Sequence, residues 1–385
     1  MNARVSSISA PAIAVIGGGV IGLAAAWRLA QRGARVTVFD KAATGSGASH
    51  SAAGMLAACA EAEPREDALT ALNRASQHLW PSFAAELEDA SGLSVGLRTE
   101  GTLVLALTAD DQARLKHMLA RQQSLGLPVE WISPAQARRR EPHLAPGIAG
   151  AVWSPRDHQV DNRLVAAALR VAATKAGVAA REQTAVDRIL VEQGRVRGIG
   201  IGDKTVAADV VVLAAGAWSA SIEGLPKPHR PPVRPVKGQM VALRMDAKAP
   251  LLNHVVWAPG AYLVPRSDGR LLIGATVEEK GFDPSLTAGG QLALLEAAWR
   301  ALPGIEDLPI DEAWVGFRPG SRDDAPIIGM GPAEGLVYAT GHYRNGILLT
   351  PVTAKAVADL VFDGVADASM RPFGLERFAA QVAAE

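Results

Sequence analysis

The chain has 385 residues, of which 49% are hydrophobic and 20% charged, and its 39 basic and 39 acidic side chains give a formal net charge of zero. This composition is typical of a globular protein with room for two domains, and the balanced charge gives no reason to expect a nucleic acid or an anionic membrane as partner. The single cysteine, Cys59, excludes an internal disulfide and a cysteine-based metal cluster. Because no apolar run reaches the ~18 residues of a membrane span, and the first eleven residues lack the apolar centre of a signal peptide, we expect a cytoplasmic protein.

Residues 12–40 predict a nucleotide-binding unit. An apolar strand over 12–16 leads into Gly17, Gly19 and Gly22 at the spacing G-x-G-x-x-G. We expect a helix over 23–31 and a second strand over 35–39, which ends at Asp40. In such a unit the first glycine makes the tight turn, the second lets the backbone approach a pyrophosphate, and the third lets the helix press on the strand. The helix N-terminus faces the phosphates, and the acid accepts a ribose hydroxyl. This context predicts an adenine dinucleotide site, with a generic α/β turn as the alternative.

The next elements differ in character. Residues 41–63 are mostly small and contain three glycines, so this segment can run close to a ligand. A long amphipathic helix is expected over 66–91, with Gly92 at its end. The elements expected after it are a strand at 102–107, a helix at 110–124, a strand and short helix over 129–142, and a strand at 149–153.

The middle of the chain returns to the βαβ pattern. Asp161 is placed to cap a helix that stops at Gly177, and alternating residues around a turn at Gln193-Gly194 predict a small β-meander. An apolar strand over 210–215 ends in small residues, which favours a second close approach to the cofactor. The elements expected beyond it are a proline-rich linker at 226–235, strands at 237–243, 254–257, 261–265 and 271–275, a helix at 292–302, a strand at 336–340, and a helix at about 347–362.

These patterns predict a mixed α/β fold with two domains interleaved in the sequence. A Rossmann-type dinucleotide domain is expected to comprise 1–92, 154–226 and 319–385. A substrate domain built on an antiparallel sheet is expected to comprise 93–153 and 227–318. Parallel strands with helical crossovers favour the first assignment, and hairpin-like strands favour the second.

The sequence GHYRNGILLTP places a loop, 341–346, directly before a helix, whose N-terminal amides would face the cleft. A flavin suits that position, since protein dipoles near its pyrimidine ring tune its potential. Arg318 follows Trp314 and Phe317 in an apolar context, where an unpaired charge is costly. Its planar fork, with Arg344 and the hydroxyl of Tyr262, suits a substrate carboxylate, although a surface arginine or a packed tyrosine is the alternative for each alone.

Seven stretches together resemble the D-amino-acid oxidase family of FAD-dependent oxidoreductases, and most closely its glycine-oxidising branch, which serves thiamine biosynthesis. They are VIGGGVIGLAAAWRLA, SAAGMLAACAE, VVVLAAGAWS, PVKGQM, YLVPRSDGRLLIGAT, GFRPGSRDDAPIIG and GHYRNGILL. The resemblance covers nearly the whole chain, and the last three stretches are its most specific part. It implies a Rossmann-type FAD domain with an antiparallel sheet over the flavin.

The resemblance also assigns residues. It implies that Arg318 binds the substrate carboxylate with help from Tyr262, and that Arg344 and Glu61 lie at the substrate. The cofactor-binding residues expected from the motifs and the resemblance together are Gly17, Gly19, Val20, Ile21, Gly22, Asp40, Lys41, Ser49, Gly54, Met55, Val186, Ala215, Gly216, Trp218, His342, Tyr343, Arg344, Asn345, Gly346, Ile347 and Leu348. FAD would be non-covalent, because relatives that attach it through a cysteine do so late in the chain. Cys59 is early, and we expect it to be buried. No metal site is expected.

The implied reaction is hydride transfer from a small amino acid to the flavin. Hydrolysis of the imino acid gives an oxo acid, glyoxylate from glycine, and ammonia; molecular oxygen then yields hydrogen peroxide. A homotetramer is implied as well. Three alternatives stay open: a D-amino-acid or sarcosine oxidoreductase, a glycine dehydrogenase with an acceptor other than oxygen, and an NAD(P)-binding protein without flavin. The strand after Arg270 lacks the lysine of sarcosine-oxidase-like relatives, which weakens that alternative.

Overall fold

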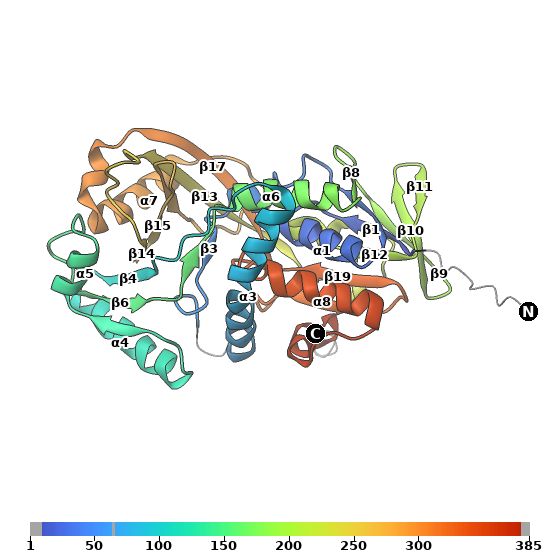
Figure 1. Cartoon of the computed structure of the whole chain (residues 1–385), viewed down its shortest axis with the longest axis horizontal. Helices are drawn as coiled ribbons and strands as arrows, with labels where there is room; N and C mark the ends of the chain where they lie inside the picture. The colour runs from blue at the N-terminus through green and yellow to red at the C-terminus, as the bar shows by residue number, and fades with distance from the viewer. Residues whose placement is uncertain (1–9, 64–65, 379–385) are drawn as a thin grey trace, which may run out of the picture.

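The computed structural model describes residues 10–63 and 66–378. The expectation about a signal peptide concerns residues 1–11, and residues 1–9 of these lie outside the described part. The fold is built on two large sheets that lie at opposite ends of the molecule (Figure 1). One sheet has six strands and contains the glycine-rich unit, and the other has eight strands.

The six-stranded sheet has parallel pairings throughout except at β18, which is antiparallel to β19. Its strands, in spatial order, are β18 (Ile327–Met330), β19 (Leu336–Thr340), β12 (Val210–Leu213), β1 (Ala12–Ile16), β2 (Arg35–Phe39) and β8 (Ala179–Arg181). The central strand β1 is apolar on both sides because both faces of the sheet are covered. Ile13 and Val15 belong to the core on the helical face, whereas Ala14 and Ile16 belong to the core on the other face.

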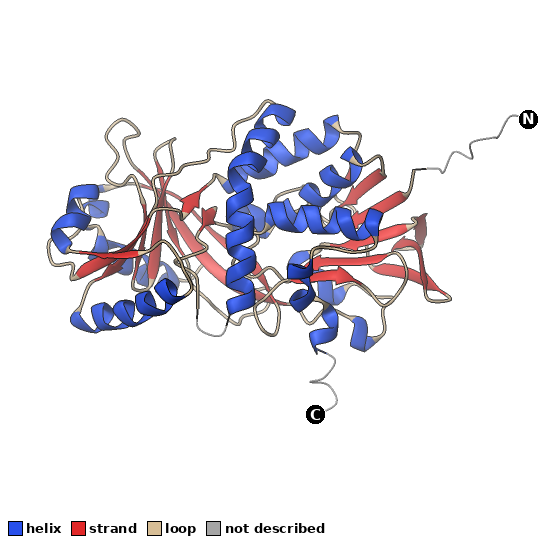
Figure 2. Cartoon of the chain, turned by 60° about the horizontal axis from the view of Figure 1, so that its bottom comes forward, coloured by secondary structure: helices blue, strands red, loops and turns tan. Residues whose placement is uncertain are grey.

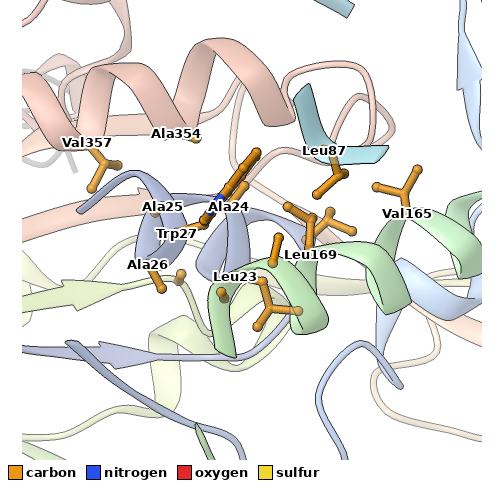
Figure 3. Close-up of a cluster of buried hydrophobic side chains, with 14 of the residues drawn as sticks. Leu23, Ala24, Ala25, Ala26, Trp27, Leu87, Val165, Leu169, Ala354 and Val357 are labelled. Atoms are coloured by element: carbon orange, nitrogen blue, oxygen red, sulfur yellow. The ribbon is translucent and has the colours of Figure 1, made fainter. Parts of the chain in front are cut away.

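Four helices cover one face of this sheet (Figure 2). They are α1 (Val20–Gln31), α3 (Asp67–Ser91), α6 (Asn162–Lys175) and α8 (Thr350–Asp363). Figure 3 shows Trp27 of α1 in this core, with Leu87 of α3, Leu169 of α6 and Val357 of α8 around it. Small residues along α1 allow these helices to approach it closely, since three of them are alanines with no exposed surface.

A small antiparallel sheet covers the opposite face. Its strands are β9 (Arg188–Glu192), β10 (Arg195–Ile201) and β11 (Lys204–Ala207). Ile189 and Ile199 pack there against Ile16, Val211 and Leu213 of the six-stranded sheet. The glycine-rich unit is therefore enclosed between two layers.

The eight-stranded sheet is mostly antiparallel, with one parallel pair between β4 and β14. Its strands, in spatial order, are β17 (Ile310–Gly320), β13 (Arg234–Arg244), β16 (Arg270–Gly274), β15 (Ala261–Pro265), β14 (Val255–Ala258), β4 (Thr102–Ala106), β6 (Gly150–Ser154) and β5 (Glu130–Ile132). Strand alternation separates its two faces. On β15, Ala261 and Leu263 pack toward helix α7 (Ala288–Ala301), whereas Tyr262 and Val264 lie on the other face.

The remaining elements connect or flank these layers. They are α2 (Ala48–Ser51), α4 (Ala109–Ser124), α5 (Pro134–Arg140), the short pair β3 (Met55–Leu56) and β7 (His158–Gln159), and the 3-10 helices η1 (Gly216–Ser221), η2 (Lys227–His229), η3 (Pro303–Asp307), η4 (Ala368–Phe373) and η5 (Leu375–Phe378). No helix in 10–63 or 66–378 has the length and apolarity needed to span a bilayer.

Three helix starts differ from the sequence-based expectation. Helix α1 begins at Val20, three residues early, because Gly19 is its N-cap. Helix α7 begins at Ala288 and not at 292, because the hydroxyl of Thr287 accepts a hydrogen bond from the backbone N–H of Gly290. Helix α8 begins at Thr350 and not near 347, and turns precede it. The expected linker is also shorter, since β13 already starts at Arg234.

Asp161 joins the two halves of the fold, as the cap of α6 and as a partner of buried arginines. Its Oδ1 accepts from the N–H groups of Arg163 (2.9 Å) and Leu164 (3.3 Å), and its Oδ2 accepts from Arg270 (2.7 Å). The guanidinium of Arg266 lies 3.8 Å away, and burial lowers the pKa of that arginine to about 10. The one carboxylate therefore stabilises a helix end and a desolvated charge.

Asp161→Ala should lower the free energy of unfolding by about 2–4 kcal/mol, because it removes a cap and leaves Arg266 without its counter-charge. Asp161→Asn keeps an oxygen for the cap and loses only the charge, so its loss should be smaller. Urea unfolding of the purified proteins measures both. Equal losses of unfolding free energy in the two variants would show that the cap contributes nothing. An unchanged free energy in Asp161→Ala would contradict both the cap and the counter-charge contributions.

Candidate functional site

A cavity of about 900 Å³ runs between the two sheets. Its walls come from β1, α1, β2 and the segment that follows β12 on one side and from β13, β14, β15 and β17 on the other. This volume is at the upper end of the range for small-molecule sites, as a large cofactor with a substrate beside it requires.

One end of the cavity is formed by the glycine-rich turn. Gly17 has φ +105°, and a Cβ there would lie 2.3 Å from the carbonyl oxygen of Ala214. A Cβ on Gly22 would lie 1.9 Å from the carbonyl oxygen of Gly17. Gly22 therefore brings α1 onto the turn and does not itself line the cavity. Gly19 has no side chain to cap α1, and the hydroxyl of Ser49 accepts from the N–H of Val20 (3.0 Å), so the following N–H groups of the first turn are the ones that an anion can use.

Asp40 and Lys41 lie beside that turn at the end of β2. The carboxylate of Asp40 accepts from the N–H groups of Gly18 (2.7 Å) and Ala42 (2.8 Å), and each oxygen keeps capacity for a further donor. The ammonium of Lys41 lies 3.5 Å from the centre of the Trp218 ring, and burial lowers its pKa. A ribose hydroxyl and an aromatic base are suitable ligands for such surroundings.

At the other end, four side chains from separate elements meet: Arg318 from β17, Tyr262 from β15, Arg344 from the loop after β19, and Glu61 from the loop after β3. The guanidinium of Arg318 donates to the carbonyl oxygens of Thr276 (3.0 Å) and Lys237 (3.5 Å). It fits there because a Cβ on Gly238 would lie 2.4 Å from its Nη1. Within the described residues no carboxylate is paired with it, so its charge is available to a ligand.

Burial also shifts the pKa values of two side chains near Arg318. Burial raises the pKa of Tyr262, whose hydroxyl donates to the sulfur of Met240 at 3.3 Å. Burial likewise raises the pKa of Glu61 to about 7, despite the nearby positive charge of Arg344. A long ion pair joins Arg344 to Glu63 at 3.8 Å, so its charge is only partly compensated.

The loop 341–349 reaches the cavity only in part. Burial lowers the pKa of His342 to about 3, so its ring is neutral, and its Nε2 lies 3.0 Å from the hydroxyl of Thr353. Asn345 and Leu348 are buried behind the cavity wall, and the carbonyl of Leu348 accepts from Ser76 and Trp80. Because α8 starts at Thr350, the turn at 346–349, and not the first helical turn, faces the cavity.

Most residues expected at the site line this cavity, the exceptions being Gly22, Asn345 and Leu348. Those that line it are Arg318, Tyr262, Arg344, Glu61, Gly17, Gly19, Val20, Ile21, Asp40, Lys41, Ser49, Gly54, Met55, Val186, Ala215, Gly216, Trp218, His342, Tyr343, Gly346 and Ile347. The sequence analysis did not find Met240 and Trp257, which also line it. In the sequence only strand alternation indicates these two residues, and it places them on the same face of the sheet as Tyr262.

The residues fit a flavin adenine dinucleotide. The open helix start and the close-approach glycines suit its pyrophosphate, and the small residues of 46–54 leave room for a flat ring system. Cys59 is buried, and its burial raises the thiol pKa to about 12, so it is no candidate for attachment. The described ranges contain no group of three or more side chains that would hold a metal ion.

Comparisons with known proteins agree with this geometry. The model of the family described as FAD dependent oxidoreductase (DAO) matches residues 12–360. The chain is 41% identical over 377 residues to a glycine oxidase of Geobacillus kaustophilus, covering 97% of this chain and 98% of the relative. It is 38% identical to a bifunctional protein ThiO/ThiG of Trichormus variabilis, covering 96% of this chain and 55% of that protein. The chain thus spans about half the length of the bifunctional relatives.

The crystal structure of glycine oxidase from Geobacillus kaustophilus superposes with a TM-score of 0.89 at 40% identity, covering 95% of this chain and 99% of that one.

Proposed function

The chain belongs to the family of FAD-dependent oxidoreductases (DAO), and from this we propose that it is an oxidase of glycine and of other small amines or D-amino acids. The products would be an oxo acid (glyoxylate from glycine), ammonia and hydrogen peroxide, with molecular oxygen as the electron acceptor. The observation that carries the proposal is Arg318, a guanidinium without a carboxylate partner among the described residues, in the same cavity as the dinucleotide fingerprint.

The protein's own residues would bind and orient the substrate. Arg318 takes the carboxylate through its planar fork, and the hydroxyl of Tyr262 adds a donor beside it. Met240 and Trp257 form an apolar wall that excludes water and restricts the size of the side chain. FAD, when bound, supplies the acceptor for the hydride from the substrate α-carbon. The rate enhancement then depends mainly on holding that carbon in position.

The direct test is anaerobic mixing of the purified yellow protein with glycine, sarcosine, D-alanine and a bulky D-amino acid, each followed by loss of the visible flavin absorbance. We expect fast bleaching by glycine and sarcosine and slower bleaching by larger substrates. Bleaching only by larger D-amino acids would move the assignment to a D-amino-acid oxidoreductase. No bleaching by any of them would contradict the proposed substrate class.

The electron acceptor is tested separately. A protein that is bleached by glycine, but forms no hydrogen peroxide when air is admitted, would be a dehydrogenase that uses another acceptor. A colourless protein that binds NAD(P) would contradict the flavin assignment as a whole.

Further parts of the proposal rest mainly on the family resemblance. They are non-covalent FAD, a homotetramer, a cytoplasmic location and a role in thiamine biosynthesis. We also propose the division into an FAD domain (1–92, 154–226 and 319–385) and a substrate domain (93–153 and 227–318). It is supported by the origin of the strands in the two large sheets.

A further inference from the structure

Among the residues that the structure describes, none is paired with the carboxylate of Glu61. It lines the cavity at the end where Arg318 and Tyr262 lie. Within 10–63 and 66–378 it makes no side-chain hydrogen bond and no ion pair; its only hydrogen bond is from its backbone N–H to the carbonyl of Ala57 (3.2 Å). No contact within the described residues therefore explains this side chain, which lines the cavity and is available to a ligand.

The loop that carries Glu61 is nevertheless held firmly. The buried carboxylate of Asp157 accepts from the N–H groups of Cys59 (3.0 Å) and Ala60 (2.7 Å). From the other side, the amide of Gln122 donates to the carbonyl of Cys59 at 2.9 Å. The backbone that leads to Glu61 is therefore held in place, and the Glu61 side chain lines the cavity.

The charges around Glu61 oppose one another. Arg344 and Arg318 favour its ionised form, whereas Asp157 and Glu63 disfavour it. Burial is the largest influence, and it raises the pKa of Glu61 to about 7. A carboxylate whose pKa is raised in this way is a better proton acceptor than an ordinary one.

Two tyrosines contact this set: Tyr343, whose hydroxyl accepts from Arg344 (3.5 Å), and Tyr262, which lines the cavity with Arg318. Burial raises the pKa of Tyr262, so its hydroxyl stays protonated at neutral pH and serves as a donor. This end of the cavity then offers donors, from Tyr262 and Arg318, for an anionic group, and the carboxylate of Glu61, unpaired among the described residues, for a cationic one.

We propose that Glu61 binds the amino group of the substrate and accepts the proton that the ammonium form must lose before oxidation. This rests on the proposed function and deepens it. An amino acid in water is a zwitterion, and Arg318 and Glu61 present complementary charges to its two ends. In the proton step, one N–H bond of the ammonium breaks and the proton bonds to a carboxylate oxygen of Glu61. The electron pair of that bond stays on the nitrogen as the lone pair of the neutral amine.

The inference is tested with Glu61→Gln, which keeps the shape and removes the charge and the proton acceptor. Glu63→Gln is the matched control. It removes an equal charge two residues along the chain, and the side chain of Glu63 is exposed and does not line the cavity. For the holoenzyme of each protein, kcat/KM for glycine is measured from pH 5.5 to 9. The Kd for glycolate, which has the carboxylate but no amine, is measured by calorimetry on the same proteins.

We expect Glu61→Gln to lower kcat/KM for glycine at least tenfold at pH 8, and to remove the fall in kcat/KM that the unaltered protein shows below about pH 7. The Kd for glycolate should stay within threefold or become tighter, because a negative charge has been removed. Glu63→Gln should keep the fall in kcat/KM but move it to slightly lower pH, because one charge that disfavours the ionised form of Glu61 has been removed.

Two results would overturn the inference: a retained fall below pH 7 in Glu61→Gln, or equal losses of glycine turnover and glycolate binding, which would indicate a merely deformed cavity. If the unaltered protein does not oxidise glycine, sarcosine or D-alanine, the proposed function fails and this inference fails with it. If the unaltered protein oxidises glycine and Glu61→Gln is fully active, the proposed function stands and only this inference is contradicted.

Discussion

Arg318→Ala should raise the apparent KM for glycine by about 10- to 150-fold while FAD stays bound. A hydrogen bond to a charged group contributes roughly 1.5–3 kcal/mol, and this is the corresponding change in affinity. The side chain donates to the carbonyl oxygens of Thr276 and Lys237, which hold one side of the fork. With no carboxylate partner in the described part of the chain, its remaining donors are the ones a substrate carboxylate would use.

Two further variants make this result specific. Arg318→Lys keeps the charge but loses the planar fork, so it should recover only part of the affinity. Arg322→Ala removes an exposed arginine four residues away that does not line the cavity, and its KM should be unchanged. Steady-state kinetics gives KM, and the visible absorbance of the purified proteins gives their FAD content. Unchanged KM in Arg318→Ala would refute the carboxylate assignment.

Gly22→Ala should abolish stable FAD binding and destabilise the fold by about 3 kcal/mol or more. The added methyl group would lie 1.9 Å from the backbone oxygen of Gly17 and 3.3 Å from the side chain of Val15. Neither the turn nor β1 can give way easily, since β1 is paired on both sides within the sheet. Relief of the overlap must therefore move α1 away from the turn and open the phosphate-facing end of the cavity.

Gly289→Ala is the control for this variant. Gly289 lies in the first turn of α7, and no heavy atom lies within 4 Å of a Cβ placed there. The alanine should be neutral or stabilise the protein by a few tenths of a kcal/mol up to about 1. The ratio of visible to ultraviolet absorbance and the midpoint of thermal unfolding measure both proteins. Normal flavin content in Gly22→Ala would show that the turn tolerates displacement.

The sequence predicted best where the local pattern and the final environment agree. The apolar run of β1, the glycine spacing and Asp40 all belong to one continuous segment, so their relation is already present in the chain. The family resemblance and the α/β fold class are confirmed by the family match and by the superposed crystal structure. Helix α6 and its cap, Asp161, were also found, because capping is a local interaction.

The sequence predicted less where distant segments meet. Nothing near Glu61 in the sequence indicates that its carboxylate lacks a donor among the described residues, since that depends on Asp157 and on which way the loop turns. Met240 and Trp257 line the cavity because of strand alternation in a sheet whose register local patterns do not determine. The late start of α8 likewise reflects buried contacts of Leu348 with α3, and its N-cap residue, Leu349, has no polar side chain that would indicate a helix start in the sequence.

The order in which the chain runs through the two sheets has a consequence for biosynthesis. Gly17 leaves the ribosome early, whereas Arg344, at the other end of the same cavity, is added more than 300 residues later. At about 5–20 residues per second, roughly 15 to 65 s pass between them. Until β14 is synthesised, one edge of strand β4 also remains unpaired. This edge can associate with strands of other chains. FAD can be enclosed only after synthesis is nearly finished, so supply of the cofactor and protection of the unfinished chain would together set the yield of active protein in the cell.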